Sequence, residues 1–302
     1  MTTTAPTTAT ASIDRPTVVA PARRARRRRR RPRVGTNIVA IVFSIVWIFP
    51  VYWMVNTAFK PRAEVMNPTP HFFPYQPTVQ NFVVAITQSD FLRDLLNSLI
   101  VVIGALIISL ALALFASAAL SRFRFRGRRV IMIVILAVQM LPATALLIPQ
   151  FLIFNDLGLL DSYFGLILAY VASVLPFSIW TLRGFFVTIP VEVEEAAMMD
   201  GASTWRTLRS VLFPLVVPGV ISTSVFAFIS AWNEYILAYT FMKDQTMYTL
   251  PIWLVSFSTP TTGTDYGGQM AASVLFALPV VIFFLVIQRH LVTGMSAGAV
   301  KG

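Results

Sequence analysis

Six long apolar runs without a charged side chain divide the sequence from residue 38 onward. A helix needs about 20 apolar residues to cross the hydrocarbon layer of a bilayer, and the runs have this length. We therefore predict an all-α polytopic membrane protein with six transmembrane helices. The predicted spans are Ile38–Phe59, Leu96–Leu120, Val130–Phe154, Tyr163–Leu182, Leu212–Trp232 and Met270–Ile287.

Five prolines lie inside these runs, where they would break a helix in water. In a membrane bundle, neighbouring helices can satisfy the carbonyl groups that a proline leaves without a donor. We therefore expect kinked helices around a cavity rather than straight rods. The prolines are Pro50, Pro142, Pro149, Pro176 and Pro279.

The basic residues between the runs predict the direction of the spans. Cytoplasmic segments of membrane proteins carry an excess of Lys and Arg. Counted on alternate sides of the six runs, 20 basic residues lie on the side of both termini and 4 on the other side. The sequence therefore predicts a multi-pass protein with both termini in the cytoplasm.

The composition excludes several classes of function. Charged residues make up only 12% of the chain, about half their usual share in a soluble domain. The chain has no cysteine, and its two histidines, His71 and His290, are far apart in the sequence. Thiol chemistry, Cys-based zinc sites and a His-based triad lack the residues they need, so we predict no catalytic residue and no metal site.

The net charge of +11 comes mainly from the N-terminal segment, since residues 1–35 hold ten Arg and one Asp. Anionic lipid head groups attract each arginine by roughly 1 kcal/mol, which favours an orientation anchor. The alternatives are a nucleic-acid arm or a regulatory docking site. Because no aromatic residue is interleaved with the arginines, we predict the lipid bilayer and no nucleic acid as the partner.

These features divide the chain into three parts. Residues 1–35 form a Thr/Ala-rich and Arg-rich cytoplasmic tail, which has too little apolar content to pack and is predicted to be disordered. Residues 36–292 form the transmembrane domain with its six helices, and residues 293–302 form a cytoplasmic C-terminal tail.

The connection between the fourth and fifth runs is nearly 30 residues long. Pro190 suits a first helical turn, and three glutamates follow it where the positive end of a helix dipole favours them. Gly201 should end this short helix, Ser203 can cap a second one, and Pro214 marks the entry into the fifth span. A helix that begins with acidic residues and carries small side chains in its middle is suited to dock in a groove of another protein.

This connection resembles the EAA signature of ABC importer permeases. Phe213 stands where that family usually has Leu. The spaced Gly and the two prolines, on the predicted cytoplasmic side, make the match far more specific than Glu-Ala-Ala alone. The matching residues are Glu195-Ala196-Ala197, Asp200-Gly201-Ala202, Val211, Phe213-Pro214 and Pro218.

The resemblance implies a coupling helix that docks in a cleft of an ATPase subunit. In such permeases, the Glu that matches Glu195 holds polar contacts, and the Gly that matches Gly201 permits the turn. An ordinary amphipathic loop helix is the alternative. The predicted coupling residues are Glu195, Ala196, Ala197, Asp200, Gly201, Ala202 and Pro214.

Other residues are similar to the MalG-like permease subunit of maltose-type importers, a resemblance that covers residues 35–302. They are Asn97-Ser98, Trp232-Asn233-Glu234 and the ending Gly294-Met295-Ser296-Ala297-Gly298-Ala299-Val300-Lys301-Gly302. In the maltose-type relatives, the C-terminal tail reaches the interface between the two ATPase subunits, and an outward loop enters the sugar cleft of the binding protein.

In this chain, the resemblance places the contact of the C-terminal tail with the ATPase subunits at Gly298, Lys301 and Gly302. It places the loop that enters the binding protein at residues 259–266. A frayed end and a plain solvated connection are the alternatives.

Polar side chains within the apolar runs are costly in a bilayer and are therefore candidates for function. Most should form hydrogen bonds between helices. We predict a pathway contact at Trp232, Asn233 and Glu234, because aromatic faces beside amide and carboxylate groups suit the CH faces and hydroxyls of sugars. The polar candidates are Asn97, Gln139, Gln150, Asn233 and Glu234.

The chain has no G-x-x-x-x-G-K-[ST] pattern, so we predict that it does not bind ATP by a P-loop itself. Its spans lack a cluster of titratable groups, so we predict that it is not an enzyme. The resemblance implies that a partner ATPase binds ATP and Mg and that this chain holds no cofactor. The resemblance implies an importer permease for a di- or oligosaccharide in the bacterial cytoplasmic membrane. Its partners would be a homologous second permease, two ATP-binding subunits and an extracytoplasmic sugar-binding protein. The alternatives are a permease of this class for a non-sugar solute, and a secondary carrier, which would need buried acids near the midplane.

Overall fold

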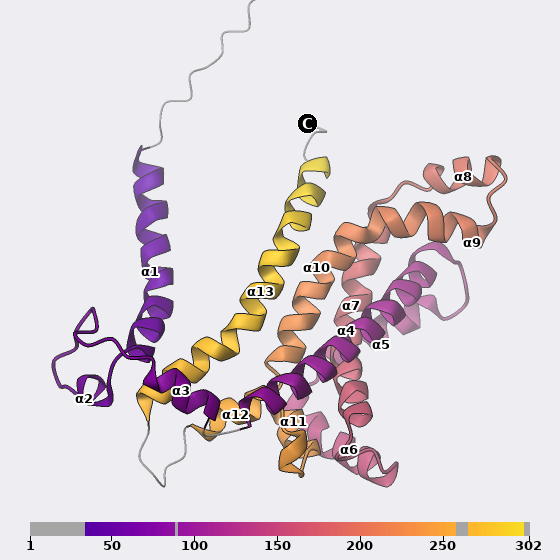
Figure 1. The fold of residues 1–302 in the computed structure, drawn as a ribbon. Helices are drawn as coiled ribbons and strands as arrows, with labels where there is room; N and C mark the ends of the chain where they lie inside the picture. The colour runs from indigo at the N-terminus through magenta and orange to yellow at the C-terminus, as the bar shows by residue number, and fades with distance from the viewer. Residues whose placement is uncertain (1–33, 88–89, 258–264, 299–302) are drawn as a thin grey trace, which may run out of the picture. The chain divides into compact units, whose positions relative to one another are not determined.

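The computed structural model describes residues 34–87, 90–257 and 265–298. Packing divides the chain into two units, Met1–Ile48 and Phe49–Gly302. The described part of the first unit is the beginning of helix α1 (Val34–Ala58), whose large apolar side chains are exposed. The second unit contains the end of α1 and all the other helices (Figure 1).

Among the described residues, five helices are long and apolar enough to cross a membrane, and a sixth span is added if one bent pair is a single span. The described residues contain no strand, so the predicted all-α fold is confirmed. The five are α1, α4 (Phe91–Arg122), α7 (Tyr163–Thr188), the continuous helix of α9 (Thr204–Thr207), η1 (Leu208–Leu212) and α10 (Phe213–Trp232), and α13 (Tyr266–Gly298). The bent pair is α5 (Arg128–Gln139) and α6 (Ala143–Asp156).

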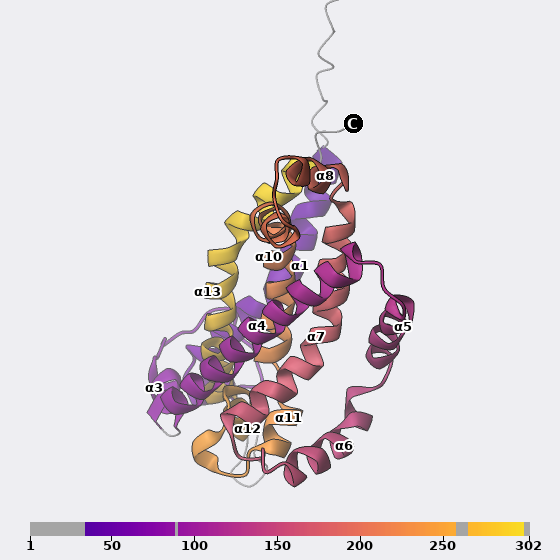
Figure 2. The same cartoon turned by 90° about the vertical axis from the view of Figure 1, so that its right-hand side faces the viewer.

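Short helices lie between the long ones. Within the second unit, α8 and α9 lie at one end, and α6, α11 and α12 lie at the opposite end (Figures 1 and 2). The short helices are α2 (Arg62–Val65), α3 (Gln80–Thr87), α8 (Glu192–Met199), α11 (Ile236–Phe241), η2 (Gln245–Met247) and α12 (Leu250–Ser256).

The centre of the second unit is the contact of α4 with α7 and α10. Every fourth residue of α4 is buried there, and most of these residues are small. Because residues four apart share one helix face, small side chains allow the α7 backbone to approach closely. Beside this face, a Cβ on Gly104 would lie only 2.8 Å from Cδ1 of Ile167. The buried set, called the α4 stripe below, is Asn97, Val101, Ala105, Ser109, Ala113 and Ser117.

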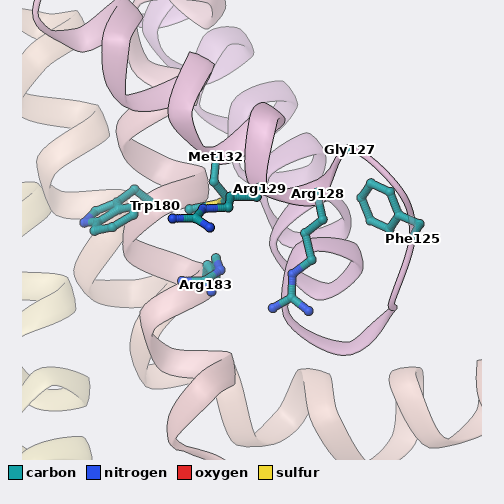
Figure 3. A pocket seen from close by; sticks show the side chains of 7 residues that line it. All are labelled: Phe125, Gly127, Arg128, Arg129, Met132, Trp180 and Arg183. Atoms are coloured by element: carbon teal, nitrogen blue, oxygen red, sulfur yellow. The ribbon is translucent and has the colours of Figure 1, made fainter.

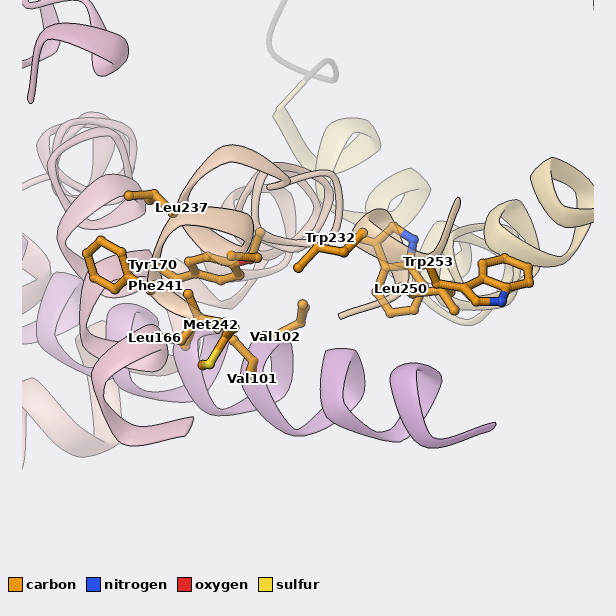
Figure 4. Packing of buried hydrophobic residues seen from close by; sticks show 14 of the residues in the cluster. Val101, Val102, Leu166, Tyr170, Trp232, Leu237, Phe241, Met242, Leu250 and Trp253 are labelled. Carbon is orange, nitrogen blue, oxygen red and sulfur yellow. The ribbon is translucent and has the colours of Figure 1, made fainter. Parts of the chain in front are cut away.

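Large side chains fill the core towards the end that holds α11 and α12. Figure 4 shows residues of α4 and α7 facing residues of α10 and α11 across this cluster. The largest of them, Trp232, is 1% exposed. Its ring stacks on Phe228, with 5.6 Å between the ring centroids. The core therefore holds the C-terminal end of α10 firmly in place.

Asn97, at the start of the α4 stripe, fixes the connection before α12. Its Nδ2 donates to the carbonyl oxygens of Thr246 (3.0 Å) and Tyr248 (2.8 Å). Its Oδ1 accepts from the hydroxyl of Tyr163 at 2.7 Å. Asn97 therefore uses both ends of its amide inside the fold, as expected for most polar groups in the apolar runs.

The third predicted span is two helices rather than one kinked helix. α5 ends at Gln139 and α6 begins at Ala143, with an angle of 104° between them. Pro142, which precedes α6, has an extended backbone, and a proline also disfavours the α conformation of the residue before it, here Leu141. The expected kink at this proline is therefore a sharp bend.

The second short helix that the sequence predicts after Gly201 does not stop before Pro214. It continues through a π turn, in which the Phe213 N–H donates to the Leu208 carbonyl, into α10. Inside a regular helix, a proline removes one backbone hydrogen bond and its ring clashes with the carbonyl four residues earlier. The wider turn just before Pro214 relieves this conflict, so the helix is continuous.

Candidate functional site

The segment α8–α9 begins where the sequence predicts a helix. The carbonyl of Pro190 accepts a hydrogen bond from the Val193 N–H at 3.3 Å. The first turn of α8 carries Glu192, Glu194 and Glu195, next to the positive end of the helix dipole. The carboxylates therefore favour a helix start at this point.

Gly201 ends α8, as predicted. Its φ of +83° lies in the left-handed region. The N–H of Ala202 donates to the Ala197 carbonyl and the N–H of Gly201 to the Met198 carbonyl, both at 3.0 Å, which forms a Schellman motif. A Cβ on Gly201 would meet no atom within 4 Å. The backbone conformation, and not lack of space, therefore requires glycine.

The start of α9 is also fixed locally. The Oγ of Ser203 accepts a hydrogen bond from the Arg206 N–H at 3.4 Å, so the predicted cap is present. The ring of Trp205 stacks on Phe115 of α4, with 6.2 Å between the centroids and 11° between the planes. α8 and α9 therefore form a protrusion with two defined helix ends.

Most of the predicted coupling residues lie together on this protrusion, while Pro214 lies beyond the π turn. Glu195, Ala196, Asp200, Gly201 and Pro214 are exposed, and Ala197 and Ala202 are half-buried. The sequence analysis did not single out Met199, which is 88% exposed beside them. A pair of methionines at the end of an acidic helix was the available signal, because an exposed apolar side chain on a protrusion suits a protein contact.

Arg122, the last residue of α4, holds the start of α8. Its Nε lies 2.5 Å from Oε1 of Glu194, and its Nη2 donates to the Ile189 carbonyl at 2.9 Å. The two charged side chains are only 12% and 13% exposed. We call these two contacts of Arg122, with Glu194 and with the Ile189 carbonyl, the clasp. The sequence analysis did not predict the clasp, because Arg122 and Glu194 are 72 residues apart in the sequence.

A pocket of about 450 Å³ lies between the bent pair α5–α6 and helices α7, α10 and α11. Two phenylalanines, Phe177 and Phe226, lie on its wall with ring centroids 3.8 Å apart. Because α5 and α6 bend between them, Gln139 and Gln150 line the same cavity. The polar lining side chains are Gln139, Thr144, Gln150, Ser173, Ser230 and Glu234. We call this cavity the polar pocket.

Of the three predicted pathway residues, Glu234 lines the polar pocket, and its Oε1 accepts from the Leu237 N–H at 2.9 Å. Asn233 is exposed, and its Nδ2 donates to the Ile229 carbonyl at 2.8 Å. The buried Trp232 donates its indole N–H to the Phe276 carbonyl at 3.2 Å. Trp232 and Asn233 are therefore outside the pocket lining, and Trp232 has a packing role.

Three other predictions lie mainly outside the described residues. These are the N-terminal tail at residues 1–35, the loop at residues 259–266, and the tail contact at Lys301 and Gly302. Gly298 is the last residue of α13. Within the part of the chain that the structure describes, no group of three or more His, Cys, Asp or Glu could hold a metal ion.

Comparison with known proteins places the whole arrangement in one family. Residues 105–297 match the family described as binding-protein-dependent transport system inner membrane component. The chain is 44% identical over 270 residues to the diacetylchitobiose uptake system permease protein DasC of Streptomyces coelicolor, covering 89% of this chain and 98% of that protein. It is 34% identical to the trehalose/maltose transport system permease protein MalG of Thermococcus litoralis, covering 89% and 97%.

The fold resembles a chain in the crystal structure of a bacterial ABC transporter involved in the import of the acidic polysaccharide alginate. The TM-score is 0.74 at 24% identity, and the match covers 85% of this chain and 95% of that chain. With the family match over most of the described helices, this protein belongs to the binding-protein-dependent transport system inner membrane components, the permease subunits of ABC transporters.

Proposed function

We propose that this chain is the permease subunit of an ABC importer for a di- or oligosaccharide. With a homologous second permease, it forms the path for a sugar that an external binding protein delivers. ATP and Mg are bound by two separate ATPase subunits, and this chain holds no cofactor. In the proposed topology, six spans cross the bacterial cytoplasmic membrane, with α5–α6 as one of them, and both termini face the cytoplasm.

The observation that carries the proposal is the protrusion α8–α9. Its exposed Glu195 and its left-handed Gly201 sit in the segment that resembles the EAA signature. The Arg122–Glu194 clasp joins the protrusion to α4, and a continuous helix joins it to α10. A site that couples ATP hydrolysis to transport must bias a two-state element, and a docked helix with such connections is suited to this task.

The proposed solute class rests on the relatives and on the polar pocket. The relatives named above are uptake proteins for diacetylchitobiose and for trehalose or maltose. The pocket combines aromatic faces at Phe177 and Phe226 with amide and carboxylate groups at Gln139, Gln150 and Glu234. Such a lining offers stacking surface for sugar CH faces and hydrogen-bond partners for hydroxyls. We therefore place sugar contacts in this pocket, at Glu234 rather than Trp232.

The test is uptake of radiolabelled mono- and disaccharides, diacetylchitobiose and trehalose among them, by cells that carry the chain, its deletion, or Glu195→Lys. Glu192→Lys makes the same charge change three residues earlier and is the matched control. Membrane abundance of each variant is measured by immunoblot. We expect loss of uptake of one sugar in the deletion and in Glu195→Lys, with uptake retained in Glu192→Lys.

Two results would contradict the proposal in different ways. Uptake of every sugar that survives the deletion would refute the sugar assignment and favour a non-sugar solute. Uptake that survives Glu195→Lys at normal abundance, or that collapses equally in Glu192→Lys, would refute a specific coupling role for Glu195. Uptake that continues after ATP depletion but stops when the proton gradient is dissipated would indicate a secondary carrier.

A further inference from the structure

A second pocket, of about 530 Å³, lies between the start of α5 and the second half of α7 (Figure 3). It has no role in the function proposed above. Three arginines, Arg128, Arg129 and Arg183, line it together with Trp180, Met132 and Phe125. In Figure 3, Arg129 and Arg183 lie on the same side of the pocket as Trp180, and Arg128 lies towards Phe125. We call this cavity the arginine pocket.

The positive charge of the arginine pocket has no carboxylate partner within the described residues. Asp or Glu pairs there with Arg93 and Arg122, but with none of the three pocket arginines. Arg183 donates from Nε to the Leu120 carbonyl at 3.4 Å, a contact that leaves its charge uncompensated. Guanidinium groups gathered without a counter-charge favour the binding of an anion, and phosphate matches their planar geometry.

The start of α5 adds to this preference. Gly127 occupies the N-cap position with a φ of +90°, and no side chain caps the helix there. The first N–H groups of a helix lack partners within it and carry the positive end of its dipole. Because Gly127 itself lines the pocket, this helix end and the guanidinium groups act on the same space.

The remaining walls indicate an anion with an apolar body. Trp180 is 42% exposed, and its ring forms one side of the pocket. From the pocket, α5 continues with apolar side chains that are also exposed: Val130 (62%), Ile133 (57%) and Val134 (53%). A free phosphate ion gains nothing from such a surface, whereas an acyl chain is stabilised by each CH₂ group that it buries there.

The depth of the pocket also fits a lipid head group. Arg183 lies five residues before the end of α7, which is about 8 Å along the helix axis at 1.5 Å for each residue. An arginine near the end of a spanning helix can reach the membrane interface, where lipid phosphates lie. Basic pockets between helices on the cytoplasmic side are typical sites for anionic head groups.

We propose that the arginine pocket binds the phosphate of an anionic phospholipid, whose acyl chain lies along the exposed face of α5. The lipid fastens α5 to α7 in the bilayer. The guanidinium groups of Arg129 and Arg183 hold the phosphate, and Trp180 covers the glycerol backbone. This role is independent of the solute that the protein carries.

The test uses the purified full-length chain in nanodiscs of phosphatidylcholine with increasing amounts of phosphatidylglycerol that has brominated acyl chains. Bromine quenches nearby tryptophans, and the difference between the chain and Trp180→Phe isolates the signal of Trp180. We expect saturable quenching of Trp180 at low phosphatidylglycerol content. In Arg129→Gln/Arg183→Gln, the apparent affinity should fall about 30-fold, since each arginine near anionic lipid contributes a factor of about five.

Arg124→Gln/Arg126→Gln removes the same charge from the neighbouring loop between α4 and α5, outside the pocket lining, and is the matched control. Arg129→Gln alone is the second variant, because Arg183 also contacts α4 and its loss could disturb folding. Equal weakening in the control would reduce the effect to diffuse charge attraction and overturn the proposal. Displacement of the lipid by millimolar inorganic phosphate or glycerophosphate would identify a soluble-anion site instead. Unchanged lipid binding in Arg129→Gln would also overturn it.

Discussion

Helices α5 and α7 are both uncharged and apolar over most of their length, yet they pack in different ways. Half of the most apolar window of α7 is buried inside the protein, against α4 and α10. In contrast, no residue of α5 is buried. Hydropathy therefore predicts which segments leave water, but it does not predict which of them meet inside the same chain. The difference lies in the small residues of the α4 stripe, against which α7 and α10 pack.

Helix α5 packs against its own chain only through a few residues, Met132 and Ile135 among them. The rest of its surface is free for other molecules, and we place the proposed lipid there. The seam of α4 with α7 has no such freedom. Four sets of variants test this contrast between the tightly packed helices α4 and α7 and the loosely packed pair α5–α6.

The largest effect is expected from overpacking the α4 stripe. Ala113 is fully buried, so Ala113→Phe must push α4 and α7 apart, at a cost of about 3 kcal/mol, the upper part of the range for overpacked cores. Ile133→Phe on α5, where Ile133 is 57% exposed, should change the stability little. Thermal unfolding in detergent, followed by size-exclusion chromatography, measures both. Similar losses in the two variants would contradict the contrast.

The next effect concerns the clasp between α4 and α8. Arg122→Ala removes the Glu194 pair and the bond to the Ile189 carbonyl, which should cost about 2 kcal/mol. Hydrogen exchange should then become faster in residues 189–202, while α5 keeps its rate. Arg124→Ala, an exposed arginine two residues later, is the control. Unchanged exchange in residues 189–202 would mean that the clasp does not hold α8.

Replacement of glycine by alanine should have opposite effects on stability at two positions. Gly201→Ala places a Cβ on a left-handed backbone and should cost about 1–2 kcal/mol. Gly184→Ala lies inside α7 with no atom within 4 Å of the new Cβ, so it should stabilise the helix by about 0.5–1 kcal/mol. Thermal unfolding of both variants measures the difference. A loss at Gly184 as large as that at Gly201 would contradict the backbone argument.

The smallest effect on stability, less than about 1 kcal/mol, is expected for Pro142→Ala. Its effect on geometry should be larger, because Leu141 is then free to take the α conformation and α5 can continue towards α6. The chain has no native cysteine, so spin labels at Ile133→Cys and Leu152→Cys, both exposed, report the bend cleanly. We expect a longer distance between the labels. An unchanged distance would show that packing, and not Pro142, sets the bend.

Most of the sequence predictions that the structure confirms rest on the local backbone preferences of single residues. The start of α8 near Pro190, its end at Gly201 and the cap at Ser203 follow from the backbone preferences of these residues, and the structure confirms all three. Five of the six apolar runs also coincide with long helices, because bilayer thickness sets their length, while the third run forms the bent pair α5–α6.

The remaining features depend on residues far apart in the sequence. The clasp pairs Arg122 with Glu194, which three helices (α5, α6 and α7) separate in the sequence, and no periodicity indicates it. The bend between α5 and α6 brings Gln139 and Gln150 into one pocket, and its only signal in the sequence is a proline. This signal is ambiguous, because other prolines lie inside unbroken helices: Pro176 inside α7 and Pro149 inside α6. Trp232 resembled a pathway residue because its neighbours are polar, but tertiary packing buries it.

The π turn before Pro214 has a mechanical consequence. It keeps residues Thr204–Trp232 as one rod of 29 residues, about 43 Å long. A displacement of α9 is therefore transmitted along a continuous helix to its other end, next to Glu234, and no flexible loop interrupts the path.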